Sequence, residues 1–172
     1  MFGNNDFSRI SRDLSGDESE KGGFAMSVSI ISTSDAQDNH YAMTATAVAS
    51  VSLDPESMLV CVNKSTLFNK AIEELEMFCV NLLASDQAAL SKDCSGGLPQ
   101  DNRVNEDQWE ILENGLAILK DSQLNILCRK SKMFEYGTHN ILIGDVYDIL
   151  VNRNIDPLLY MDGSYGRFRE IK

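Results

Sequence analysis

The chain of 172 residues is long enough to bury a hydrophobic core and is most simply one domain. Its hydrophobic content of 43% and charged content of 24% are ordinary for a globular protein. Acidic residues number 26 against 15 basic ones, and the net charge of −11 argues against binding nucleic acid or an anionic membrane through a broad electrostatic surface. Any anionic ligand must therefore be held at a local site.

Features of membrane, secreted and metal-binding proteins are not found. No apolar run approaches the roughly 20 residues that span a bilayer, and the first residues lack the basic region and apolar core of a signal peptide. We therefore expect a cytoplasmic protein. The cysteines are widely spaced, without a CxxC pair or a nearby histidine, which predicts buried thiols rather than a metal site or a disulfide framework. They are Cys61, Cys79, Cys94 and Cys128.

The chain divides into a short polar start and a longer patterned part. Residues 1–23 are polar and charged and contain several glycines, which predicts a helix or arm followed by a loose link. The folded domain is expected over residues 24–172. Alternating or short continuous apolar runs predict strands over 26–33, 41–54, 58–62, 78–84, 123–130 and 139–151, with 156–168 closing the chain.

Two short helices are expected between these strands. The apolar face from Leu67 to Leu75 predicts one helix, capped by Ser65 or Thr66. A second helix is expected from Ser85. Many strands with few short helices favour a β-barrel decorated by helices over alternating βαβ units.

The segment YAMTATAVASVSLDP, residues 41–55, carries an unusual row of small side chains. With a period of two, one face is apolar from Met43 to Leu53, and the other carries threonines and serines, with Val48 as the exception. Two interpretations stay open. The hydroxyls form the solvated side of an antiparallel strand, or the small side chains let a flat ligand approach the backbone closely.

NKST, residues 63–66, is the one anion site that the sequence favours. It joins a buried strand to an amphipathic helix, whose N-terminus offers free N–H groups beside Lys64 and two hydroxyls. An ordinary capped helix explains the same residues. His139, at the start of a strand, is likewise open to a structural or a functional interpretation. The absence of GxGxxG, P-loop, HExxH and Ser/His/Asp patterns argues against nucleotide-binding folds of those types, metalloenzymes and hydrolases.

Four ordered motifs resemble one known family. MTATAVASVSLDPESMLVCVNKS, FCVNLLASDQAALS, GTHNILIGDV and PLLYMDGSYG occur in the order seen in flavin reductases of the FMN-binding split-barrel type. These include the reductase components of two-component flavin monooxygenases, such as that of 4-hydroxyphenylacetate 3-monooxygenase. The resemblance covers roughly residues 24–168. It implies a mainly β homodimer of split barrels that reduces FMN or FAD with NADH or NADPH.

The resemblance further implies that the reduced flavin passes to a separate oxygenase, which acts on an aromatic compound. The alternative is a flavin-binding redox carrier or sensor of the same barrel without reductase turnover. The residues implied for flavin binding are Thr44, Thr46, Ala47, Val48, Ser50, Cys61, Val62, Asn63, Lys64, Ser65, Thr66, Asn81, Leu82 and Leu83. His139 is implied to orient the nicotinamide, with Tyr165 on the same side. Cys94 replaces an aromatic residue of the family, so no stacking contact is carried over there.

Overall fold

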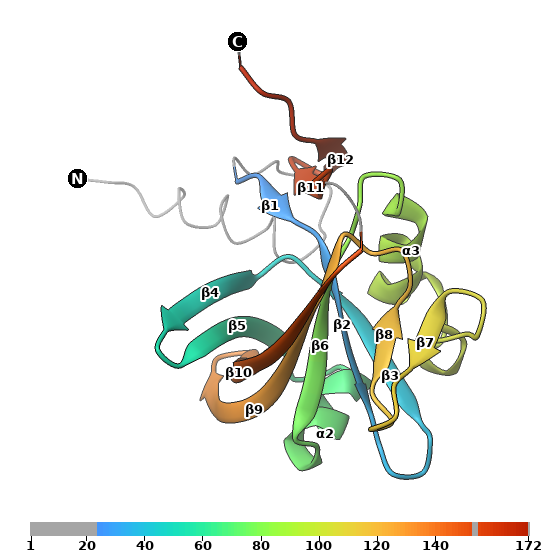
Figure 1. Cartoon of the computed structure of the whole chain (residues 1–172), viewed down its shortest axis with the longest axis vertical. Helices are drawn as coiled ribbons and strands as arrows, with labels where there is room; N and C mark the ends of the chain where they lie inside the picture. Colours follow the sequence, from blue (N-terminus) through green and yellow to red (C-terminus); the bar gives the residue numbers. More distant parts are fainter. Residues whose placement is uncertain (1–23, 153–154, 172) are drawn as a thin grey trace.

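The computed structural model describes residues 24–152 and 155–171, so the arm predicted over 1–23 lies outside the described residues. Within these ranges the chain is mainly β, with antiparallel strands in three sheets and two short α-helices (Figure 1). No helix of the described ranges combines the length and the apolarity needed to cross a bilayer. The expected fold class, mainly β with short helices, is confirmed.

A seven-stranded sheet, in the order β3-β2-β6-β9-β10-β5-β4, forms the body of the molecule. Its strands are β2 (Ser29–Ser34), β3 (His40–Ala45), β4 (Val48–Leu53), β5 (Glu56–Asn63), β6 (Met77–Leu82), β9 (Leu124–Tyr136) and β10 (His139–Val151). The small sheets are β1 (Met26–Ser27), β11 (Leu158–Met161) and β12 (Ser164–Arg167), and β7 (Trp109–Ile111) with β8 (Ala117–Leu119). The helical elements are α2 (Leu67–Glu74), α3 (Ala88–Lys92), the π-helical turn η1 (Asp93–Gly97) and the 3₁₀ turn η2 (Gln100–Asn102).

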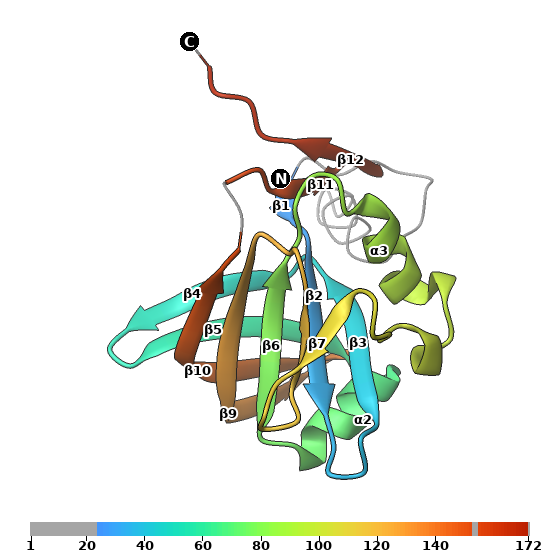
Figure 2. The same cartoon turned by 45° about the vertical axis from the view of Figure 1, so that its right-hand side comes forward.

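The large sheet curls because its two edge strands are joined by only two residues. β3 ends at Ala45 and β4 begins at Val48, although these strands lie at opposite edges of the sheet. The Cys61 N–H donates to the Ala47 carbonyl (3.0 Å), which extends the β4–β5 pairing into the link. The Val48 N–H donates back to the Thr46 carbonyl (3.0 Å) and makes the link a tight turn. Figures 1 and 2 show the resulting bent sheet with α2 at one end.

The prediction of one strand over 41–54 is therefore wrong. Met43 and Ala45 are buried, as the predicted apolar face requires, but Val51 and Leu53 are 51% and 90% exposed. The alternation fails because the chain turns at the link and changes from one sheet edge to the other. A further register shift in the β4–β5 pairing lies between Ser50 and Ser52.

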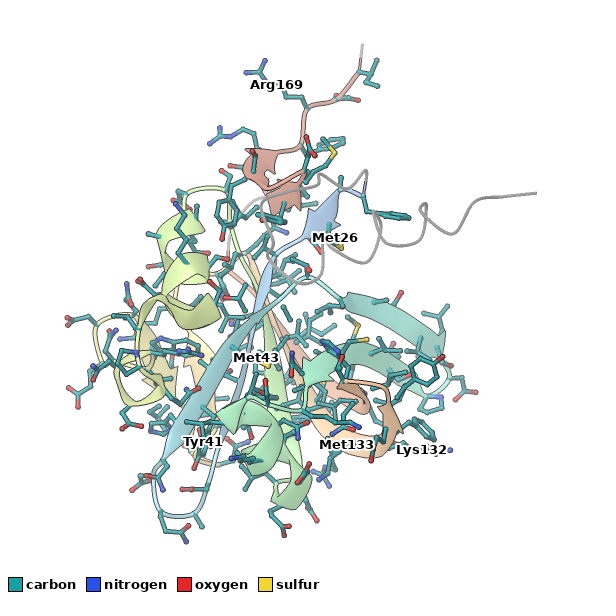
Figure 3. The ribbon with its side chains drawn as sticks, turned by 180° about the vertical axis from the view of Figure 1, so that it is seen from behind. Met26, Tyr41, Met43, Lys132, Met133 and Arg169 are labelled. Carbon is teal, nitrogen blue, oxygen red and sulfur yellow. The ribbon has the colours of Figure 1, made fainter. Side chains whose placement is uncertain are left out.

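The inner side of the curled sheet encloses the main core, and α2 closes one end of it. Phe68 and Ile72 of α2 are fully buried against the sheet, and burial of each such side chain contributes about 1.5–3 kcal/mol. The cluster comprises Ile31, Met43, Ala45, Val60, Val62, Phe68, Ile72, Phe78, Val80, Cys128 and Leu142. Figure 3, which views the molecule from behind, shows Met43 near its middle.

A second core lies on the outer side of the sheet, beneath β7, β8 and the α3–η1 region. Its buried residues are Val28, Ile30, Ala42, Leu83, Cys94, Trp109, Ala117, Leu119 and Leu158. All four cysteines are free thiols, and all but the half-buried Cys61 are buried. Among the described residues, no three His, Cys, Asp or Glu side chains gather closely enough to hold a metal ion.

The two helices begin for different reasons. Thr66 caps α2, and its hydroxyl accepts a hydrogen bond from the Asn69 N–H (3.1 Å), as one of the two predicted caps. α3 begins at Ala88 with Gln87 as its N-cap, so the prediction that Ser85 opens this helix is wrong. The Ser85 hydroxyl instead donates to the Asp156 carboxylate (2.5 Å), a contact that the local sequence does not indicate.

Candidate functional site

Residues 63–66 form a preformed turn between β5 and α2, held by its own side chains. The Asn63 side-chain oxygen accepts hydrogen bonds from the Ser65 N–H (2.9 Å) and hydroxyl (2.8 Å). The Asn63 carbonyl accepts from the Thr66 N–H (3.1 Å) and hydroxyl (2.8 Å). These bonds fix the backbone before any ligand binds. We call this segment the NKST turn.

Donors that suit a phosphate group remain at the NKST turn. The N–H groups of Leu67 and Phe68, the first two of α2, have no hydrogen-bond partner among the described residues. The N-terminal end of a helix also carries a partial positive charge. Lys64 lies three residues before the start of α2, and its ammonium forms an ion pair with Glu135. Two backbone donors, a helix end and a lysine are together a donor set that fits a phosphate.

The tip of the β9–β10 hairpin packs on the NKST turn and brings His139 to it. The Lys64 N–H donates to the Thr138 carbonyl (3.1 Å), and His139 pairs directly with Asn63 across β10 and β5. His139 Nδ1 and the Thr138 hydroxyl share a hydrogen bond of 2.9 Å. Residues that the sequence places far apart therefore adjoin one another, with the histidine half-buried at the rim.

The link between β3 and β4 lies beside the end of β5 that leads into the NKST turn. The hydrogen bond from the Cys61 N–H to the Ala47 carbonyl fixes this neighbourhood. The half-buried residues here are Thr46, Ala47, Val48 and Cys61, and Ser50 is exposed. Burial raises the pKa of the Cys61 thiol, which keeps it protonated at neutral pH. The Val62 side chain is fully buried in the main core, so Val62 can offer a ligand only its backbone.

Thr44 and Tyr165 meet at Ser91 of α3 and form a second polar cluster. The Thr44 hydroxyl donates to the Ser91 carbonyl (2.6 Å), and the Ser91 and Tyr165 hydroxyls share a hydrogen bond of 2.9 Å. The Lys92 ammonium lies 5.8 Å from the centre of the Tyr165 ring. Sequence reasoning missed Ser91, because a serine in a short helix carries no signal of its own.

Tyr165 and His139 are not neighbours within one chain. β12, which carries Tyr165, lies at one end of the molecule, and α2 lies at the other (Figures 1 and 2). His139 adjoins the start of α2 through the NKST turn. A single chain therefore does not unite the two residues that the sequence assigned to the nicotinamide side.

Asn81 is directed into the protein rather than toward a ligand surface. Its side chain is fully buried, and its Nδ2 donates to the Ile30 carbonyl of β2 (2.8 Å). Its side-chain oxygen accepts from the Leu119 N–H of β8 (2.8 Å). Leu83 is equally buried, and Leu82 is half-buried. The Asn81 side-chain oxygen also accepts from Asn125 Nδ2 of β9 (2.7 Å), so the Asn81 side chain bonds β6 to three neighbouring strands.

Cys94 is buried as the sequence predicts, whereas the contact of Glu135 is one that the sequence does not indicate. Cys94 is 2% exposed and packs in the outer core, so its side chain faces the protein interior. Glu135 is an exposed acidic residue near the hairpin tip. The sequence does not indicate it as a site residue, because its contact with Lys64 depends on the fold. Only the pairing of the β9–β10 hairpin with β5 brings them together.

Comparisons with known proteins find flavin reductases and reductase components. A flavin reductase like domain matches residues 21–169. The reductase component of the FADH2-dependent resorcinol hydroxylase of Rhizobium sp. strain MTP-10005 is 37% identical over 145 residues, which cover 83% of this chain and 80% of that protein. RutF, an NADH-dependent FMN reductase of Pseudomonas syringae pv. syringae, is 36% identical over 143 residues, with 83% and 80% covered. The solved structure of the flavin reductase PheA2 has a TM-score of 0.78 and 31% identity, covering 94% of this chain and 98% of that chain.

Proposed function

This chain belongs to the flavin reductase like family, and on that premise we propose that it is an NADH-dependent flavin reductase that supplies reduced flavin to a separate oxygenase. The observation that carries the proposal is that the hairpin tip with His139 packs on the NKST turn. Relatives named as an NADH-dependent FMN reductase and as a reductase component support the same activity. They favour it over a redox carrier or sensor without turnover.

Different residues of the site would contact different parts of the flavin. Lys64 and the N–H groups of Leu67 and Phe68 would hold the phosphate of FMN or FAD, since the N-terminal end of a helix favours an anion. The rest of the flavin would lie along Thr46–Val48 and beside Cys61, where small side chains leave the backbone accessible. When bound, the flavin supplies the acceptor for the hydride of NADH.

His139 would orient the nicotinamide rather than act as an acid or base. Its Nδ1 is engaged with the Thr138 hydroxyl, which fixes the ring and leaves Nε2 as the nitrogen that can reach a ligand. Hydride transfer depends on close stacking of two rings, so the contribution expected of the protein is orientation. A positioned imidazole at the rim of the site supplies it.

We further propose a homodimer of split barrels built from residues 24–172, acting in the cytoplasm. A strongly curled sheet whose edges are joined by a short link supports the split barrel. Phe134 and Tyr136, 51% and 80% exposed on β9, supply apolar surface for a second copy. Tyr165 of one chain and His139 of the other would then share a site that neither chain forms alone.

The activity test uses the purified full chain with NADH and either FMN or FAD, followed by the loss of nicotinamide absorbance. Turnover with at least one flavin is expected, and NADPH in place of NADH measures the donor preference. Absence of turnover with both flavins contradicts the proposal. Flavin that stays bound through dialysis, with negligible oxidation of NADH, would favour the carrier or sensor.

A further inference from the structure

We propose that Glu135 competes with the flavin phosphate for Lys64 and thereby lowers the affinity of the NKST turn for flavin. This inference rests on the proposed position of the phosphate at that turn. It assigns a role in flavin affinity to a residue outside the sequence motifs. The argument depends on where Glu135 points, what holds it there, and what a phosphate must displace.

Glu135 faces the N-terminal end of α2. It lies directly opposite Asn140 in the β9–β10 pairing, and opposing residues of antiparallel strands project from the same face. Asn140 Nδ2 donates to the side-chain oxygen of Asn69 (2.8 Å), in the first turn of α2. The Glu135 carboxylate is paired with the Lys64 ammonium on that same side. A negative group of the chain itself therefore lies where an anionic ligand would be attracted.

The backbone, not the ion pair, keeps the two charges close. The hydrogen bond from the Lys64 N–H to the Thr138 carbonyl (3.1 Å) fixes the hairpin tip to the NKST turn. Glu135 is 76% exposed and Lys64 is 29% exposed at its side chain. An exposed pair of this kind contributes little to stability, so the carboxylate can turn aside into water when an anion arrives. It nevertheless stays nearby, because the hairpin does not move with it.

A bound phosphate would therefore face an opposing charge at close range. The N–H groups of residues 64–66 already have partners within the protein. Lys64 is the one cationic side chain of the NKST turn. Sharing Lys64 with Glu135 reduces the attraction of Lys64 for the phosphate, and the nearby carboxylate repels the phosphate. Both effects promote release of the flavin, which suits an enzyme whose product must leave for another protein.

The test compares FMN with riboflavin, which lacks the phosphate. Glu135→Gln removes the charge while keeping the shape, and we expect it to tighten FMN binding by about 3- to 10-fold, with riboflavin affinity unchanged. Affinities are measured by quenching of flavin fluorescence at low and moderate salt, and the gain should shrink as salt rises. Glu110→Gln, at an exposed position on β7, changes the net charge equally and should alter neither affinity.

Lys64→Gln separates this inference from the assignment of the phosphate site. It should weaken FMN binding, and adding Glu135→Gln to it should bring a smaller gain than in the wild-type chain, because only the repulsion of the phosphate is then relieved. If Lys64→Gln weakens FMN binding but Glu135→Gln and Glu135→Ala leave it unchanged, the competitor role is wrong while the phosphate site stands. Equal tightening of riboflavin also overturns the inference. If Lys64→Gln has no effect either, the site itself is wrong, and NADH turnover still reports separately on the proposed activity.

Discussion

Replacing Asn81 with alanine distinguishes a residue that supports the fold from one that binds flavin. The family resemblance assigns Asn81 to the flavin site, whereas its side chain is fully buried and bonded to β2 and β8. The variant removes the acceptor for the buried Leu119 N–H. The variant also removes one acceptor of Asn125 Nδ2 (2.7 Å), which keeps two others, the Leu119 carbonyl (3.1 Å) and the Ser122 hydroxyl (2.9 Å).

The expected loss follows from these contacts. An orphaned buried N–H costs about 1–3 kcal/mol. Truncation of the buried side chain adds a small cavity, so we expect the free energy of unfolding to fall by about 2–4 kcal/mol in total. The affinity of the folded variant for FMN should stay unchanged. Urea unfolding followed by circular dichroism gives the first quantity, and quenching of FMN fluorescence gives the second.

Asn102→Ala provides the matched control. Asn102 is exposed in η2, and loss of its side chain should change the unfolding free energy by no more than about 0.5 kcal/mol. The structural assignment of Asn81 is refuted if Asn81→Ala behaves like this control in urea and weakens FMN binding by about tenfold or more, a difference of about 1.4 kcal/mol.

Three further predictions concern the nicotinamide, the core and pH. His139→Ala should raise the KM for NADH and leave FMN affinity little changed, and an equal loss of both contradicts its role. Gly144→Ala would place a Cβ 2.4 Å from the Phe78 ring, so urea unfolding should show a loss of about 1–3 kcal/mol, unlike Gly166→Ala, whose Cβ meets open space. Burial raises the pKa of Cys94 from 9.0 to about 11 and that of Cys128 to about 12. Above pH 9 the unfolded chain loses these protons while the folded chain keeps them, so stability should fall by about 1.4 kcal/mol per thiol per pH unit up to about pH 11. Urea midpoints between about pH 8 and 10 measure this slope, Cys94→Ala should make it shallower, and a flat profile contradicts it.

Local patterns predicted those elements whose causes are local. The apolar face and cap of α2 lie within a dozen residues: Thr66 caps the helix and Phe68 and Ile72 are buried as expected, although Leu67 is 51% exposed. The single strand over 41–54 could not be corrected from its sequence, because the turn at Thr46–Ala47 uses neither glycine nor proline and depends on a hydrogen bond from Cys61. The start of α3 was predicted wrongly for a similar reason, because the Ser85 hydroxyl donates to Asp156, which is far away in the sequence.

The same division holds for the candidate site. The NKST turn is contiguous, so its residues could be named together from the sequence. The approach of His139 to Asn63 depends on strand register, and resemblance to a family indicated the histidine where its own pattern did not. Glu135 and Ser91 are visible only once β9 and α3 are placed. Buried and ligand-facing amides look alike in a sequence, which explains why the orientation of Asn81 was not foreseen.

The short link between β3 and β4 limits how far the large sheet can flatten. Three Cα steps separate Ala45 from Val48, which limits these atoms to about 11 Å. The outer strands of a flat seven-stranded sheet would lie about 29 Å apart. Covalent geometry therefore imposes the bend before any side chain packs. An insertion in this link would relax the bend and let the edge strands β3 and β4 move apart. The same insertion at an ordinary surface turn would change only that turn.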